Sequence, residues 1–184
     1  MYAIARALVL GLLAATTQLH AANYVFPGTL PAGCSGSGPS YTCSALTLGN
    51  NDTITINTPR PATITINGNF STDNAKINQG GLAVSLNLVV NGVLTVGYQS
   101  VLNGKVTANS VTGAAGGQAV FGGDVTATTG SVALTDKSTV AGSITANSGG
   151  ISLSNEVVVS GGLVTTSGAV NLAQTVKITG NINT

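Results

Sequence analysis

A glycine recurs at one constant interval through the second half of this chain, which has 184 residues in all. The series consists of Gly104, Gly123, Gly142, Gly161 and Gly180. An apolar residue stands two positions before each glycine and another two positions after it, as Phe121 and Val125 do around Gly123. A constant period of about 20 residues is typical of a solenoid, in which each unit buries its apolar face only against its neighbours. The repeat therefore constrains the fold of this chain more than its chemistry.

Within each repeat, apolar residues alternate with small or polar ones at a spacing of two, which is the periodicity of a β-strand. Turn-forming residues interrupt this alternation at residues 129–131 and again at residues 136–138. Each coil should thus contain a longer strand, a turn, a shorter strand and a second turn. The glycine series falls at inward positions of the longer strand, which indicates a bend or a close approach of two backbones. A bend there would give the coil three sides, and a straight strand would give it two.

Equivalent residues of stacked coils lie about 4.8 Å apart and form ladders. We therefore predict an all-β, single-stranded β-helix (β-solenoid) with coils of about 19 residues. The expected organisation is a signal peptide over residues 1–21, a cap segment over 22–45 and the β-helix over 46–184. Its coils should be irregular over residues 46–101 and regular over residues 102–184.

Segment 1–21 has the three parts of a secretory signal peptide. Arg6 supplies the positive charge, residues 7–15 form the apolar core, and Leu19-His20-Ala21 is a suitable cleavage site. The apolar run is about half the ~20 residues that a membrane-spanning helix requires. The sequence thus predicts export to the periplasm, the cell surface or the medium, with no membrane span after cleavage.

Both cysteines, Cys34 and Cys43, stand in the Gly-, Pro- and Ser-rich segment that follows. Two cysteines in an exported chain most simply form one disulfide. The alternative, a reactive or metal-binding thiol pair, lacks a histidine or a third ligand. We expect the disulfide-closed segment to cap the N-terminal end of the solenoid, because an open end exposes unpaired strand edges and core.

Charge and composition exclude several classes of function. Cleavage of the signal peptide removes Arg6 and His20, which leaves as many basic as acidic side chains and no histidine. A neutral chain has no electrostatic attraction for nucleic acid or anionic lipid. Serine or cysteine nucleophiles would lack a histidine base. The sequence therefore predicts a protein that is not an enzyme, with no catalytic residue, no cofactor and no metal site.

One acidic pair is the alternative to that prediction. Glu156 follows Asp136 by one coil plus one position, so the two should lie diagonally on one turn edge. Paired carboxylates there could hydrolyse a glycoside or bind a cation. Lys137, one coil below Glu156, favours a simple surface ion pair instead.

Outward polar residues of the regular coils form a candidate binding face, comprising Thr107, Asn109, Thr126, Thr128, Thr145 and Asn147. Regular columns of threonine on a flat face can order water and bind ice, so ice binding is a further alternative function. The same residues are also good solvent-facing residues for an uncharged sheet.

The middle of the chain resembles a known family. Segments 48–56, 64–72, 77–81 and 86–92 (LGNNDTITI, ITINGNFST, INQGG and LNLVVNG) are similar to the N-terminal β-helical region of MshQ-like proteins. That resemblance implies a part in biogenesis of the mannose-sensitive haemagglutinin type IV pilus, and it brings no catalytic residues. The later Gly-x-Val-Thr-Ala repeats also resemble the coils of bactofilin-type polymers, which are cytoplasmic.

These observations predict an exported structural or adhesive protein of the bacterial cell surface, linked to pilus biogenesis or to the extracellular matrix. The alternative is a β-helix that binds or degrades polysaccharide. Nothing after Gly180 resembles a cap, so we also expect self-association through the C-terminal coil edge. The remaining candidate partners are a pilus component and a surface polysaccharide.

Overall fold

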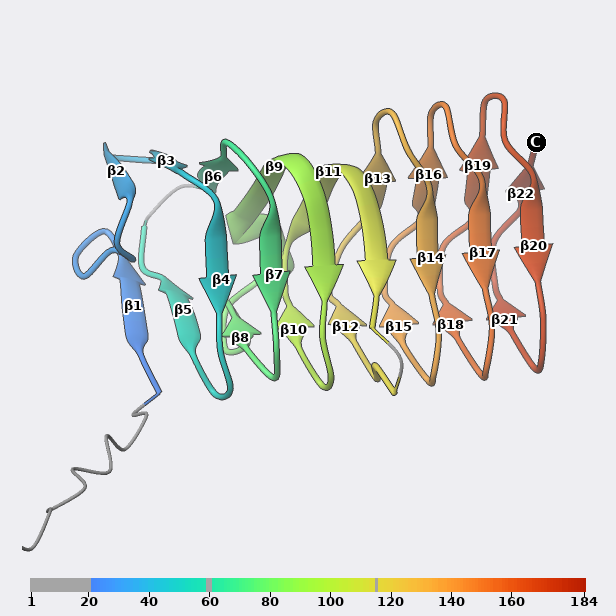
Figure 1. The fold of residues 1–184 in the computed structure, drawn as a ribbon, viewed down its shortest axis with the longest axis horizontal. Coiled ribbons are helices and arrows are strands. Elements are labelled where there is room, and N and C mark those ends of the chain that lie inside the picture. Colours follow the sequence, from blue (N-terminus) through green and yellow to red (C-terminus); the bar gives the residue numbers. More distant parts are fainter. Residues whose placement is uncertain (1–20, 59–60, 115) are drawn as a thin grey trace, which may run out of the picture.

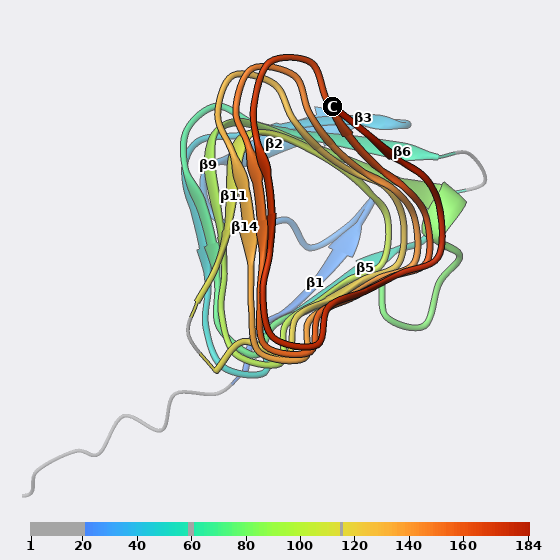
Figure 2. The ribbon, with the colours of Figure 1, turned by 90° about the vertical axis from the view of Figure 1, so that its right-hand side faces the viewer.

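The computed structural model describes residues 21–58, 61–114 and 116–184, so the predicted signal peptide lies almost wholly outside the described residues. Parallel strands wind into coils that stack along one axis (Figure 1). Seen along that axis, the coils outline a triangle (Figure 2). The predicted all-β solenoid is therefore confirmed, and the coil has three sides.

Each side of the triangle is a ladder of strands from successive coils. The first face contains β1 (Asn23–Phe26), β5 (Thr53–Ile56), β8 (Lys76–Ile77), β10 (Val101–Leu102), β12 (Val120–Phe121), β15 (Thr139–Val140), β18 (Val158–Val159) and β21 (Lys177–Ile178). The second face contains β3 (Ser40–Cys43), β6 (Ala62–Ile66), β9 (Leu86–Val96), β11 (Lys105–Gly113), β13 (Val125–Ala127), β16 (Ile144–Ala146), β19 (Leu163–Thr165) and β22 (Ile182–Asn183), with β2 (Cys34–Ser37) beside β3. The third face contains β4 (Leu46–Leu48), β7 (Phe70–Thr72), the second halves of β9 and β11, β14 (Val132–Leu134), β17 (Ile151–Leu153) and β20 (Val170–Leu172).

Parallel pairing in register stacks each inward side chain on its equivalent in the next coil. On the second face, Val106 pairs with Val125, which in turn pairs with Ile144. These three side chains are buried, whereas the intervening Thr126 is half-buried on the outer surface. The period of two in the sequence thus becomes one continuous apolar core along the axis.

The glycine series lies at the corner between the first and second faces, where the chain bends. A Cβ atom added to Gly142 would lie 2.6 Å from the Asp124 backbone nitrogen and 2.7 Å from the Gly123 carbonyl carbon. The expected bend and close backbone approach are both present. The glycines do not face the core as expected, however, because the missing side chain would point at the backbone of the preceding coil.

A second ladder of glycines stands at the corner between the second and third faces, at Gly130, Gly149 and Gly168. A Cβ atom on Gly149 would lie 2.4 Å from the carbonyl carbon of Gly130. β9 and β11 run through this corner as continuous strands, and their mutual register shifts between Ala108 and Ser110. Close stacking of backbones thus shapes two of the three corners.

The third corner turns with left-handed residues instead of glycine. One residue in each successive coil, after the third face and before the first, has φ between 46° and 66°: Asn51, Asn74, Gln99, Gln118, Lys137, Glu156 and Thr175. In the last three of these coils the residue before it is left-handed as well, at Asp136, Asn155 and Gln174. Asparagine tolerates this conformation better than most residues, and a β-branched threonine tolerates it poorly. The turn at residues 136–138 and the stacking of Lys137 below Glu156 were expected from the sequence, whereas the left-handed conformation was not.

We predict that Gly142→Val destabilises the protein. The new side chain would collide with the backbone of the preceding coil, and such overpacking typically costs about 1–3 kcal/mol. The free energy of unfolding, measured by urea titration, should fall accordingly.

Gly80→Val is the matched control, because an added Cβ at Gly80 meets no atom within 4 Å. Equal stability of the two variants would show that the corner has room for a side chain.

Candidate functional site

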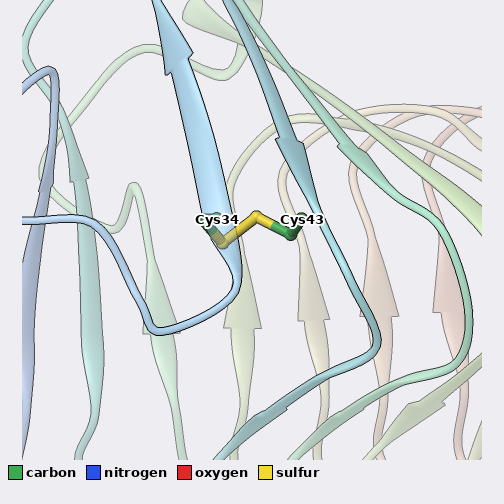
Figure 3. Close-up of a disulfide and its surroundings, with 2 residues drawn as sticks. All are labelled: Cys34 and Cys43. Carbon is green, nitrogen blue, oxygen red and sulfur yellow. A yellow bond between two sulfur atoms is a disulfide. The ribbon is translucent and has the colours of Figure 1, made fainter.

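The N-terminal end of the solenoid carries the disulfide. β2 and β3 form an antiparallel hairpin in which Cys34 lies opposite Cys43, with their Cα atoms 3.9 Å apart. A bond between the two sulfur atoms joins the strands (Figure 3). The predicted Cys34–Cys43 disulfide is therefore confirmed.

The loop between β1 and β2 crosses the end of the core (Figure 2). Leu30 of this loop packs against the core, and Pro31 is buried. Beneath them, the rings of Phe26 and Tyr41 meet edge to face with centroids 4.8 Å apart. Segment 22–45 thus covers the N-terminal end, and it also contributes coil strands, since β1 pairs with β5 and β3 pairs with β6.

We predict that replacing both cysteines, Cys34→Ser with Cys43→Ser, lowers the free energy of unfolding by about 2–3 kcal/mol, because the closed loop no longer restricts the unfolded chain. Intact mass of the exported protein, with and without reduction, reports the bond directly. Free thiols in the exported protein would contradict the pairing.

The last coil differs from the N-terminal end. Each of β20, β21 and β22 pairs with a strand of the preceding coil on one side only. Leu172 and Ile182, whose equivalents in earlier coils are buried, are 42% and 46% exposed. This edge therefore presents apolar side chains and backbone groups that a further strand could pair with.

The predicted outward residues divide between two places. Thr107, Thr126 and Thr145 stand in register on the second face. Their companions Asn109, Thr128 and Asn147 form a neighbouring column at the corner between the second and third faces, where the Thr128 hydroxyl donates to the Asn109 side-chain oxygen at 3.2 Å. The six residues are thus one threonine column on a flat face and one polar column on a turn.

At the acidic corner, Asn155 is the equivalent of Asp136 in the next coil, as Glu156 is of Lys137. The Asn155 side chain donates to an Asp136 carboxylate oxygen at 2.8 Å, and the Gly116 backbone N–H donates to the other oxygen. These hydrogen bonds, that from Asn155 first, hold the pKa of Asp136 below its ordinary value. Glu156 and Lys137 line the same shallow depression, but the expected ion pair between them is not formed.

We predict that Asn155→Ala raises the pKa of Asp136, because the charged carboxylate loses its main hydrogen-bond donor. A lowered pKa in the folded state stabilises the protein above the pKa of the unfolded chain, and this contribution is lost as the pH falls through the folded value. Carboxyl carbon shifts measured by NMR across the acid range give the pKa. Gln174→Ala, at the equivalent position one coil beyond Asn155, is the control. A pKa of Asp136 unchanged by Asn155→Ala would contradict the assignment.

The loop over residues 79–85, which includes the short 3-10 helix η1 (Ala83–Ser85), is not predicted by the repeat pattern. It projects from the corner between the first and second faces, in green in Figure 2. The buried Asn78 side chain donates to the carbonyl oxygens of Leu82 and Asn103, at 2.9 and 2.7 Å. The Asn103 side chain donates to the carbonyl of Gly81 at 2.7 Å. Two asparagines therefore fasten the loop to the corner.

Two adjoining depressions lie on the second face beside this loop. One of about 370 Å³ is lined by the loop, the Gly122–Gly123 corner, Lys105 and Asp124. The other, of about 330 Å³, is lined by residues of β6, β9 and β11. Asn87 and Lys105 line both depressions. The Lys105 ammonium group makes no hydrogen bond or ion pair with any residue that the structure describes.

No protein-family model, characterised protein or solved structure matches this chain. Over residues 21–58, 61–114 and 116–184, no group of three potential metal ligands comes together. The described part of the chain also contains no helix of the length and apolarity needed to span a membrane.

Proposed function

We propose that this chain is an exported structural or adhesive protein of the bacterial cell surface, linked to type IV pilus biogenesis or to an extracellular matrix. The observation that carries the proposal is a disulfide-closed solenoid whose coils stack in register. Disulfides persist in oxidising compartments outside the cytosol. A stacked coil architecture offers an extended surface of the kind that repeat proteins use for binding.

Self-association through the C-terminal coil edge belongs to the same proposal. Its support is the exposure of Leu172 and Ile182 beside backbone groups that lack a neighbouring strand in the described structure. Polysaccharide binding is a second candidate role, favoured by the adjoining depressions on the second face.

The proposal predicts that producing cells cleave the chain after Ala21 and display it outside the cytosol. Mass spectrometry of the N-terminus, together with protease treatment of intact cells, measures both properties. Deleting the coding region should reduce piliation, surface attachment or matrix retention, and re-expression should restore the lost property. An uncleaved protein confined to the cytosol, or a deletion without effect on all three properties, would contradict the proposal.

A further inference from the structure

We infer that the two adjoining depressions on the second face form one groove that binds a neutral polysaccharide, with the polymer lying along the solenoid axis. This inference rests on the proposed surface role and deepens it by naming the site and the chemical class of the ligand.

The dimensions of the groove favour an extended polymer. Its lining comes from β6, β9, β11 and the corner that precedes β13, which belong to four successive coils. Coils stacked about 4.8 Å apart make this roughly 14 Å from first to last. The spacing of the coils is similar to the length of one hexose in an extended chain. A polysaccharide along the axis would therefore place about one sugar on each coil.

The polar side chains of the groove suit hydroxyl groups. Thr63, Asn87 and Lys105 form an outward column, because Thr63 pairs with Asn87 and Asn87 pairs with Lys105. The Thr63 hydroxyl can both donate and accept hydrogen bonds, the Asn87 amide donates through its NH₂ group and accepts through its oxygen, and the Lys105 ammonium group only donates. None of these three side chains has a hydrogen-bond partner among the described residues. Sugar hydroxyls, which also donate and accept, can satisfy this mixed set.

The charges of the groove favour a neutral ligand. Lys105 and Asp124 line the same depression and belong to successive coils, so their opposite charges lie close together. Their opposite charges offset one another, so neither an acidic nor a basic polymer gains a net electrostatic attraction at this site. An uncharged polymer needs no such attraction and can bind through its hydroxyl groups.

The apolar side chains of the groove suit the C–H face of a pyranose ring. Val84 of the projecting loop is 77% exposed and lines the depression beside Lys105. Val89 of β9 lines the adjoining depression on the same face. Among the residues that the structure describes, no aromatic side chain lines either depression, so a single groove should bind weakly. Many copies at one surface would raise the overall affinity through multivalency.

The direct test titrates the isotopically labelled exported protein with soluble hexasaccharides and follows its amide NMR signals. The neutral probes are the hexamers of cellulose, laminarin and amylose; the charged controls are the hexamers of galacturonic acid and of chitosan. We expect at least one neutral hexamer to shift the signals of Asn87 and Lys105, and the charged hexamers to bind more weakly. No shift with any neutral hexamer, shifts centred on another face, or tighter binding of a charged hexamer would overturn the inference.

Two groove variants and two matched controls locate the site. Asn87→Ala should weaken binding about tenfold, as expected for the loss of one hydrogen bond to the ligand, and Val84→Asp should abolish it. Asn171→Ala on the third face and Val120→Asp on the first face, both at exposed outward positions, should leave binding unchanged. Thermal unfolding checks that all four variants fold. Unchanged binding by both groove variants would exclude this groove as the site.

The inference and the proposed function fail separately. If the protein is exported and needed for attachment but binds no neutral hexamer, only the polysaccharide groove is excluded. A protein that stays in the cytosol removes the proposed surface role, whatever the titration shows.

Discussion

Close stacking of one coil's backbone on the next is the constraint on which this structure depends. Parallel strands of neighbouring coils lie about 4.8 Å apart, and the chain must keep this separation where it bends as well as where it is straight. At two corners the bend leaves no room for a side chain, and the ladders through Gly142 and Gly149 meet that requirement. At the third corner the chain adopts a left-handed conformation at residues such as Gln118 and Lys137. Because each corner stacks directly on the corner of the preceding coil, the strands between the corners pair in register, and their inward side chains form one continuous core.

Once the backbone and the core hold the coils together, the outward positions carry little of the stability. Threonine, valine and asparagine occupy equivalent outward positions on the second face, at Thr145, Val164 and Asn183. Within this chain, the same outward position therefore accepts side chains of different polarity. A regular solenoid therefore separates the part of the sequence that folds from the part that contacts other molecules.

The loop over residues 79–85 is the part of the surface that differs most from the repeated coils. Its main-chain groups are held by Asn78 and Asn103, and Leu82 and Val84 are left 73% and 77% exposed. These two are the most exposed large apolar side chains among the residues that the structure describes. Beside it lie Lys105 and Asp124, so apolar, cationic and anionic groups meet in one place. The repeated coils hold these groups in place, although the groups themselves do not recur from coil to coil.

The sequence by itself determined the class of fold, the strand periodicity, the core residues of the regular coils and the pairing of Cys34 with Cys43. Each follows from a local rule: a period of two for strands, a constant glycine interval for coils, and two cysteines for one disulfide. Only the tertiary structure decided that the coil has three sides, because the same inward side chains would fill a two-sided coil. It also decided which way the Gly142 position points, since that depends on the backbone of the coil below. The groove was beyond the sequence for a similar reason: Asn87 pairs with Lys105 across a coil that departs from the regular period, so spacing along the chain does not predict their contact.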